Sequence, residues 1–294
     1  MTKMTAPAVT AAKGTRKLAM LTAYDFAAAR LAEAAGVDML LVGDSLAMVV
    51  LGHEDTLSVT MEEMLHHTKA VSRGATNALV VADMPFLSYQ VSVPEAVANA
   101  GRFLKEGRAG AVKLEGGQEV LPQVRAIVAA GIPVVGHVGL TPQHVAALGG
   151  FKVQSRTAEA AARLLDDAMR LAEAGCFALV LECIPAKVAA LVTERLPVPT
   201  IGIGAGPDCD GQVLVFHDVL GLYDRFLPKF VKRYAQLGEL AVGALTQWAD
   251  AVRNGTFPGP EHVFSMDPEA YAAFLSLAAS SPPDGSKTPD GGSV

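Results

Sequence analysis

Residues 79–117 read LVVADMPFLSYQVSVPEAVANAGRFLKEGRAGAVKLEGG. An apolar run over 79–82 leads to Asp83, a stretch of helical character covers 94–106, and a second apolar run over 111–114 leads to Glu115. Near-continuous apolar runs, unlike alternating ones, are typical of parallel strands that are buried on both faces. The stretch therefore predicts two parallel strands joined by a helix, each strand ending in a carboxylate.

The same unit recurs along the whole chain. The apolar runs lie at 18–22, 39–42, 79–82, 111–114, 134–136, 178–181, 200–203 and 213–216. Ala-rich stretches predict helices over 26–35, 94–106, 120–130, 158–174 and 186–195. Eight runs that alternate with helices indicate either a closed α/β barrel or a doubly wound open sheet.

Polar residues at the ends of the runs separate these two folds. Nearly all eight runs end in polar side chains, among them Asp44, Asp83, Glu115, His137 and Glu182. An open sheet concentrates its site at one switch point, whereas a barrel gathers groups from all strand ends onto one face. The pattern favours a (β/α)8 barrel, the TIM-barrel fold.

No linker-like stretch divides the chain. We therefore predict one catalytic barrel domain with C-terminal helices over residues 1–265, followed by a C-terminal extension over 266–294. Residues 226–255 are helical in character and are predicted to supply the last barrel helix and part of that extension. The tail SSPPDGSKTPDGGSV (280–294) has almost nothing to bury, which predicts disorder from about residue 280.

Composition excludes several classes of protein. The 294 residues are 51% hydrophobic and 18% charged, with a net charge of −6, so no basic surface is expected for nucleic acid. No apolar stretch is long enough to span a membrane and no signal peptide is evident, which predicts a cytoplasmic protein. The cysteines Cys176, Cys183 and Cys209 lack metal-ligand spacing and fit a reducing compartment. We interpret Cys183, which follows an apolar run, as a buried inert thiol and not as a nucleophile.

Three carboxylates are the strongest candidates for a metal site. Asp44, Asp83 and Glu115 each stand at the end of a predicted strand. Alone, each aspartate could equally cap the following helix. Three carboxylates at one barrel mouth would repel one another unless a cation or a proton lies between them. Oxygen ligands of this kind favour Mg²⁺.

Lys113 stands two residues before Glu115, so both side chains are expected on one face of a strand. The pair could be an ion pair at the barrel rim, or the lysine could form a Schiff base with a carbonyl substrate. Nearby carboxylates keep an ammonium charged, which works against the second role. We predict that Lys113 is an electrostatic partner for substrate oxygens.

Glu182 and His137 each allow two interpretations. Glu182 follows a strongly apolar run, where it could be a general base or a charge near the start of a helix. His137 could be a catalytic group or a hydrogen-bonded core histidine. The glycines in GIGAG (202–206) lack the spacing of a dinucleotide-binding motif and better suit a tight turn or a close approach to a ligand.

Taken together, the ordered motifs resemble those of the ketopantoate hydroxymethyltransferase family, from the start of the chain to about residue 265. The matching segments are LTAYD (21–25), VGDSLAMVVLGHEDTL (42–57), ADMPF (82–86), AVKLEGG (111–117), AGIPVVGHVGLTPQ (130–143), LECIPA (181–186), PTIGIGAGPDCDGQVLVFHDVLGL (199–222) and FPGPEH (257–262). So many motifs in one order are highly specific. The departures are Ala47, Ser58 and Ser155, and none of them replaces a proposed ligand or base.

The resemblance implies a role for each candidate residue. It places Mg²⁺ on Asp44, Asp83 and Glu115, and the 2-oxo acid on Asp44, Ser45, Asp83 and Lys113. It makes Glu182 the proton acceptor and puts His137 near the site as a possible additional site residue.

The resemblance also implies the reaction. The enzyme would transfer a hydroxymethyl group from 5,10-methylenetetrahydrofolate to 3-methyl-2-oxobutanoate in pantothenate biosynthesis, and it would assemble as a homodecamer. Its partners would be these small molecules, with neither nucleic acid nor membrane. One alternative is a magnesium-dependent C–C lyase of the phosphoenolpyruvate/isocitrate lyase type, and another is a barrel without catalytic activity.

Overall fold

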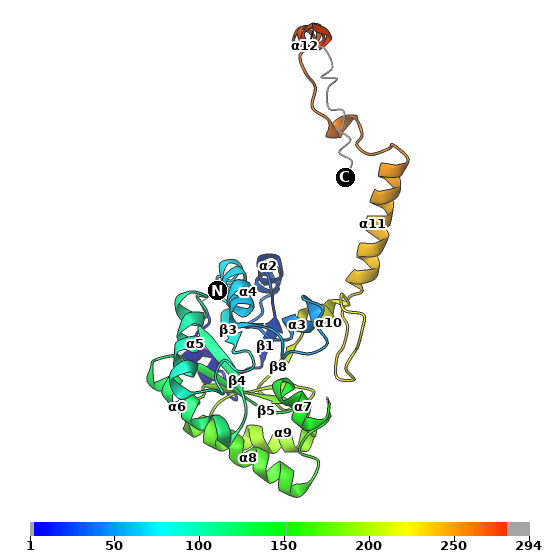
Figure 1. The fold of residues 1–294 in the computed structure, drawn as a ribbon. Coiled ribbons are helices and arrows are strands. Elements are labelled where there is room, and N and C mark those ends of the chain that lie inside the picture. Colours follow the sequence, from blue (N-terminus) through cyan, green and yellow to red (C-terminus); the bar gives the residue numbers. More distant parts are fainter. Residues whose placement is uncertain (1–2, 151, 281–294) are drawn as a thin grey trace, which may run out of the picture. The chain divides into compact units, whose positions relative to one another are not determined.

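A computed structural model describes residues 3–150 and 152–280 of the chain. Eight parallel strands form a closed barrel in sequence order, and the last strand pairs with the first (Figure 1). The strands are β1 (Leu18–Thr22), β2 (Met39–Val42), β3 (Leu79–Asp83), β4 (Ala111–Glu115), β5 (Val134–Gly139), β6 (Ala178–Glu182), β7 (Thr200–Ile203) and β8 (Gly211–Leu214). The predicted (β/α)8 barrel is confirmed.

Helices connect the strands and cover the outside of the barrel. All helices in the part of the chain that the structure describes are α1 (Ala6–Ala11), α2 (Phe26–Ala34), α3 (Leu46–Val49), α4 (Met61–Gly74), α5 (Val93–Lys105), α6 (Leu121–Ala129), α7 (Val145–Leu148), α8 (Ala158–Glu173), α9 (Ala186–Arg195), α10 (Phe216–Leu220), α11 (Leu237–Arg253) and α12 (Pro268–Ser280), with 3₁₀ turns η1 (Gln118–Val120), η2 (Pro142–His144) and η3 (Pro260–His262). Helices α2 to α10 belong to the barrel unit, whereas α11 and α12 follow it in the sequence. Side-chain caps define several starts. Thr60 and Glu63, for example, form a reciprocal capping box at the start of α4.

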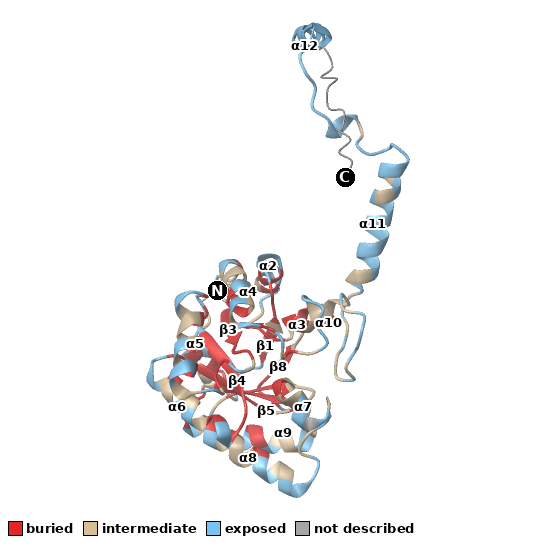
Figure 2. Ribbon diagram, in the orientation of Figure 1, coloured by how far each residue is buried: buried red, intermediate tan, exposed pale blue. Residues whose placement is uncertain are grey.

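Side chains of each strand alternate between two apolar layers. Along β4, Val112 and Leu114 pack outward among the helices, whereas Ala111 belongs to the cluster that fills the barrel. Figure 2 shows the strands buried and the outer faces of the covering helices exposed. Lys113 and Glu115 share the inward face with Ala111, so β4 carries charge only toward its C-terminal end.

Helix α1 closes the opposite, N-terminal end of the barrel. Val9 and Ala12 join the interior cluster, and Lys13 pairs with Asp210 just before β8 at 2.8 Å. A fully buried valine contributes about 1.5–3 kcal/mol. Among the described residues, the end with the strand N-termini is therefore closed, and the cavity that the strand ends line opens at the C-terminal mouth.

Two expectations for the last part of the barrel are wrong. The eighth strand covers Gly211–Leu214 and not 213–216, because Gly211 pairs with Leu18 and fits where a Cβ would lie 2.6 Å from the Leu18 carbonyl oxygen. Residues 222–236 are not helical, so α10 and not 226–255 supplies the helix that follows β8. Pro228 lacks the N–H that a helix would need at this position. Contacts of Phe230 with Gly204 and of Arg225 with Gly52 hold the segment instead.

The chain divides into two compact units, Met1–Gly238 and Glu239–Val294. The first contains the barrel. In the described part of the second, α11 and α12 have no buried residue. The predicted domain over 1–265 and extension over 266–294 remain predictions, and the disorder predicted from about residue 280 concerns residues 281–294, outside the described ones. No helix in the described part of the chain is long and apolar enough to cross a membrane.

Candidate active site

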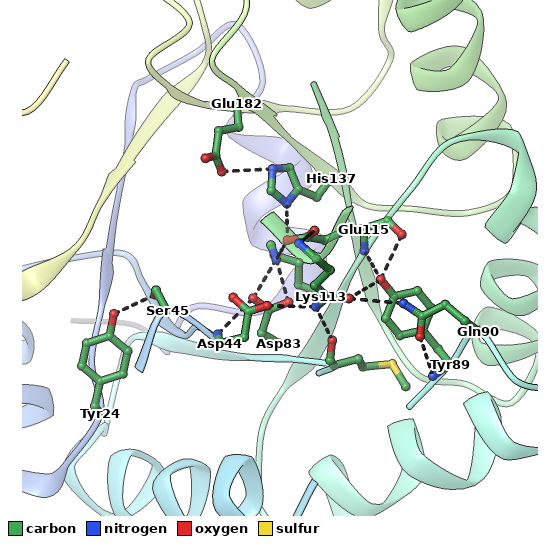
Figure 3. Close-up of polar contacts among 12 residues, drawn as sticks. Tyr24, Asp44, Ser45, Asp83, Tyr89, Gln90, Lys113, Glu115, His137 and Glu182 are labelled. Atoms are coloured by element: carbon green, nitrogen blue, oxygen red, sulfur yellow. Dashed lines mark hydrogen bonds and ion pairs between the residues drawn. The ribbon is translucent and has the colours of Figure 1, made fainter. Parts of the chain in front are cut away.

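Three carboxylates meet at the C-terminal mouth of the barrel. Asp44 follows β2, while Asp83 and Glu115 are the last residues of β3 and β4. One oxygen of each lies within 4.8 Å of the others, and all three side chains are buried (Figure 3). The sequence-based prediction that these three converge is thus confirmed in geometry.

Lys113 lies among these carboxylates, inside the barrel and not at its rim. Its Nζ is 2.6 and 2.7 Å from the two oxygens of Asp83 and 3.4 Å from Oε1 of Glu115. Burial alone would lower the pKa of Lys113, but the surrounding carboxylates outweigh it and raise that pKa above its ordinary value. The amine therefore stays protonated, which suits an electrostatic partner and not a Schiff base.

Gln143 forms hydrogen bonds with two carboxylates of the cluster. The residue types in the sequence did not predict it as a site residue. Its Nε2 donates to Asp44 Oδ2 at 2.9 Å, and its backbone N–H donates to Glu115 Oε2 at 3.1 Å. The buried Tyr89 hydroxyl donates in turn to Gln143 Oε1 at 2.7 Å. The only sequence signal for Gln143 was its place at the end of the segment 130–143.

The electrostatics of the cluster suit a divalent cation. Burial, together with the charges of Asp83 and Glu115, raises the pKa of Asp44 well above its ordinary value. Burial would also raise the pKa of Glu115, but Lys113 and His137 lower it to about 2. Buried carboxylate oxygens at these separations are the donor set of a hard cation, so the residues fit Mg²⁺.

His137 joins Glu115 to Glu182. Its Nδ1 lies 3.2 Å from Glu115 Oε1, and its Nε2 lies 3.2 Å from Glu182 Oε2 (Figure 3). The second contact is an ion pair without hydrogen-bond geometry, so within the described residues Nε2 has no hydrogen-bond partner. Burial lowers the pKa of His137, but the Glu115 charge outweighs it and raises that pKa to about 9. An imidazolium therefore lies between two carboxylates.

Glycine at position 139 allows Glu182 to lie this close to His137. A Cβ on Gly139 would lie 2.2 Å from the Glu182 carbonyl oxygen, and φ of Gly139 is +102°. The same oxygen accepts a hydrogen bond from the Leu140 N–H at 2.8 Å. The ends of β5 and β6 are therefore locked together, and they hold Glu182 at the mouth with its side chain 15% exposed.

Ser45 and Cys183 also line the site. The Ser45 hydroxyl lies 2.9 Å from the hydroxyl of buried Tyr24, a second residue that the residue-type reasoning did not single out. Cys183 borders the cavity and is only partly buried, yet burial with the charge of Glu182 raises its pKa to about 12. The prediction that this thiol is buried is therefore wrong, although a thiol that stays protonated is a poor nucleophile.

These groups surround one cavity of about 380 Å³, within the range of small-molecule sites. The carboxylates, Lys113, His137 and Glu182 form one side. The other side, which the sequence did not indicate, is formed by Asp218 and by five residues that follow it, Tyr223, Phe226, Pro228, Lys229 and Phe230. Every predicted site residue lies at this mouth, because the register of the parallel strands brings all their C-terminal ends to one face.

A closed (β/α)8 barrel with a buried acidic cluster, a charged lysine and a partly exposed glutamate at its mouth defines a barrel enzyme suited to a divalent cation. The model of the ketopantoate hydroxymethyltransferase family matches residues 3–260, and the chain belongs to this family.

Relatives of high identity agree with this assignment. The 3-methyl-2-oxobutanoate hydroxymethyltransferase of Syntrophobacter fumaroxidans is 69% identical over 264 residues, which cover 90% of this chain and 94% of that protein. The enzyme of the same name from Oleidesulfovibrio alaskensis is 64% identical over 263 residues, covering 90% of this chain and 91% of that protein. The chain is thus an enzyme of this family.

Solved structures share the fold at low identity. A phosphonopyruvate hydrolase in complex with oxalate and Mg²⁺ has a TM-score of 0.58 at 16% identity, covering 95% of this chain and 99% of that one. A 2,3-dimethylmalate lyase of the PEP mutase/isocitrate lyase superfamily has a TM-score of 0.55 at 17% identity, covering 94% of this chain and 95% of that one. These similarities show the barrel fold alone.

Proposed function

We propose that the chain transfers a hydroxymethyl group from 5,10-methylenetetrahydrofolate to 3-methyl-2-oxobutanoate, giving ketopantoate for pantothenate biosynthesis. The family and its named relatives support the reaction. The observation that carries the mechanism is the position of Glu182, a partly exposed carboxylate that His137 links to the buried acidic cluster. This arrangement sets a base beside a site for an anionic substrate.

Asp44, Asp83 and Glu115 are the residues that would hold Mg²⁺, since they are the buried oxygen donors that lie within 4.8 Å of one another. When bound there, the cation would supply Lewis-acid stabilisation of negative charge on the keto oxygen of the substrate. Gln143 keeps the oxygens of Asp44 and Glu115 oriented for this role.

The 2-oxo acid binds through the chain's own polar groups. The Lys113 ammonium attracts the substrate's oxygens and stabilises charge on them. The Ser45 hydroxyl, oriented by Tyr24, donates to the substrate carboxylate. Asp44 and Asp83 complete the contacts, since both line the cavity beside Lys113.

Glu182 accepts the proton from C3 of the oxo acid. The electron pair of the broken C–H bond then forms the enolate, and C3 attacks the methylene carbon of the donor. A water adds its oxygen to that carbon as the new hydroxyl group, while the bonds from the carbon to N5 and N10 of the donor break. The two nitrogens take up one proton from this water and one from Glu182, and tetrahydrofolate leaves. The imidazolium of His137 holds Glu182 at the mouth, which makes it a positioning residue for the base.

Proton exchange tests this proposal without the donor. We expect the C3 proton signal of 3-methyl-2-oxobutanoate to disappear in D₂O when the protein and Mg²⁺ are both present, as followed by proton NMR. Adding 5,10-methylenetetrahydrofolate should then yield ketopantoate. A folded protein that exchanges no C3 proton with any divalent cation would overturn the proposal.

The remaining parts of the proposal are the assembly and the compartment. We propose a homodecamer in the cytoplasm with only small molecules as substrates, which sedimentation and fractionation can check. The lyase alternative has support only from a fold shared at low identity, and an assay of C–C cleavage tests it. The non-catalytic alternative predicts neither exchange nor metal dependence.

A further inference from the structure

A segment without regular structure forms the wall opposite the acidic cluster. Phe230 packs on Gly204 after β7, where a Cβ would lie 2.7 Å from its ring. Arg225 donates to the Gly52 carbonyl oxygen at 3.1 Å, beyond β2 and α3. These two contacts stretch the segment across the mouth, and its side chains Tyr223, Phe226, Pro228 and Phe230 line the cavity.

Asp218 is the carboxylate on this side of the cavity. It lies on α10, whose first residue, Phe216, donates its backbone N–H to Thr22 Oγ1 of β1 at 2.9 Å. Asp218 is only 7% exposed, yet within residues 3–150 and 152–280 no hydrogen bond or ion pair reaches its carboxylate. Burial raises the pKa of Asp218 to about 6. The charge of Arg233 lowers this pKa slightly, without a direct contact between the two side chains.

An unpartnered carboxylate beside aromatic side chains indicates which chemical class of ligand can bind there. Burying it costs free energy that a donor of hydrogen bonds can recover. Its charge would repel the carboxylate of the oxo acid, which the Lys113 ammonium attracts at the acidic cluster. The ligand that fits is therefore a flat heterocycle that presents two adjacent N–H groups, the arrangement a carboxylate accepts with both oxygens.

We infer that Asp218 accepts the N3–H and 2-amino hydrogens of the donor's pteridine ring, and that Tyr223, Phe226 and Phe230 hold this ring against the oxo-acid site. This donor subsite rests on the proposed function, which supplies a reduced folate as co-substrate. At the opening of the cavity, Lys152 and Lys229 are exposed and can attract the carboxylates of the folate tail. In this cavity the positive Lys113 would bind the oxo acid and the negative Asp218 would bind the pteridine ring.

Binding of tetrahydrofolate, followed by calorimetry, tests the subsite without turnover. We expect Asp218→Asn to weaken its Kd about tenfold to a hundredfold, because a charge-assisted pair is lost. Phe226→Ala should weaken it by about threefold to tenfold through the lost ring contact. Phe226 is 61% exposed, so this second variant does not threaten folding. Asp224→Asn, an exposed neighbour that does not border the cavity, is the matched control and should bind as the wild type does.

Exchange of the C3 proton separates this inference from the proposed function. In Asp218→Asn we expect tetrahydrofolate affinity to fall at least about tenfold more than the donor-free exchange rate. Unchanged tetrahydrofolate binding in Asp218→Asn, or equal losses of binding and exchange, would overturn the donor subsite. A wild-type protein that binds tetrahydrofolate through Asp218 but exchanges no C3 proton would support the subsite and contradict the proposed function.

Discussion

The two sides of the cavity are built differently. On the side of β2 to β5, Asp83, Lys113 and Glu115 are strand residues whose charges are paired within 3.4 Å. On the side of α10 and residues 222–230, the one buried carboxylate, Asp218, has no hydrogen-bond or ion-pair partner among the described residues. The charges on the first side are already paired, so this side is preorganised to bind a cation and a small anion. The carboxylate on the second side is unpaired, and a bound ligand would supply its hydrogen-bond donors.

Replacing Lys113 by Met would break the paired side and should have the largest effect. Three buried carboxylates would remain near one another without the ammonium, and breaking such a network costs about 3–5 kcal/mol. We expect a lower Tm, no C3 exchange and a greater gain in Tm on adding Mg²⁺ than in the wild type. Thermal unfolding with and without Mg²⁺ measures this.

Lys187→Met serves as the control, because Lys187 is exposed on α9. It should leave both the Tm and its response to Mg²⁺ unchanged. If Lys113→Met kept the wild-type stability and the same response to Mg²⁺, the paired network would not stabilise the barrel mouth.

Glu182→Gln should leave the paired side folded and remove only its base. A positioned general base contributes about 10²- to 10⁴-fold, so we expect the C3 exchange rate to fall by that factor. The Tm should change little because the side chain is partly exposed. Exposed Glu194→Gln on α9 is the control for the same chemical change. Normal exchange in Glu182→Gln would remove Glu182 from the mechanism.

The sequence predicted the paired side because its residues obey local rules. Asp44, Asp83 and Glu115 follow apolar runs, and the two-residue period of a strand puts Lys113 and Glu115 on one face. Parallel strands then bring these ends together with no further information. The contacts of Gln143 could not be predicted this way, because they depend on how the loop after β5 folds back over the cluster.

The sequence did not predict the other side because long-range contacts decide it. Residues 226–236 have helical composition, but the packing of Phe230 on Gly204 and the hydrogen bond from Arg225 to Gly52 hold an extended segment instead. Neither contact can be read from the spacing of apolar residues. The segment 199–222 contained Asp218, but nothing in it indicated that its carboxylate would lack a partner.

Gly139→Ala should disturb the paired side through the backbone. The new Cβ would meet the Glu182 carbonyl oxygen, and the φ of +102° is unfavourable for alanine. We expect a loss of about 2–3 kcal/mol in the free energy of unfolding, together with slower C3 exchange. Gly131→Ala is the control, since its φ is also positive but its Cβ would meet no atom within 4 Å. Equal exchange rates in the two variants would show that the contact between β5 and β6 does not position Glu182.

Asp218→Asn should show the smallest effect on stability, and the effect should depend on pH. The folded pKa of Asp218 is about 6, above the ordinary value of 3.8, so the unfolded chain ionises first as the pH rises. The native state therefore loses stability between these two values and bears the full cost above pH 6. The full pKa difference would correspond to roughly 3 kcal/mol, but solvent at the cavity screens part of the charge. We therefore expect the asparagine variant to be more stable than the wild type by about 1–2 kcal/mol near pH 8, and equal to it near pH 4.

Urea unfolding of both proteins at the two pH values measures this difference, with Asp224→Asn as the control that should show none. Repeating the unfolding in saturating tetrahydrofolate then tests whether this ligand pairs with Asp218. If a ligand completes the unpaired side, it should stabilise the wild type more than Asp218→Asn and so reduce or reverse the advantage of the variant near pH 8. A variant that is no more stable than the wild type near pH 8 would mean that the buried carboxylate is already satisfied, and that the two sides of the cavity do not differ in the way their contacts indicate.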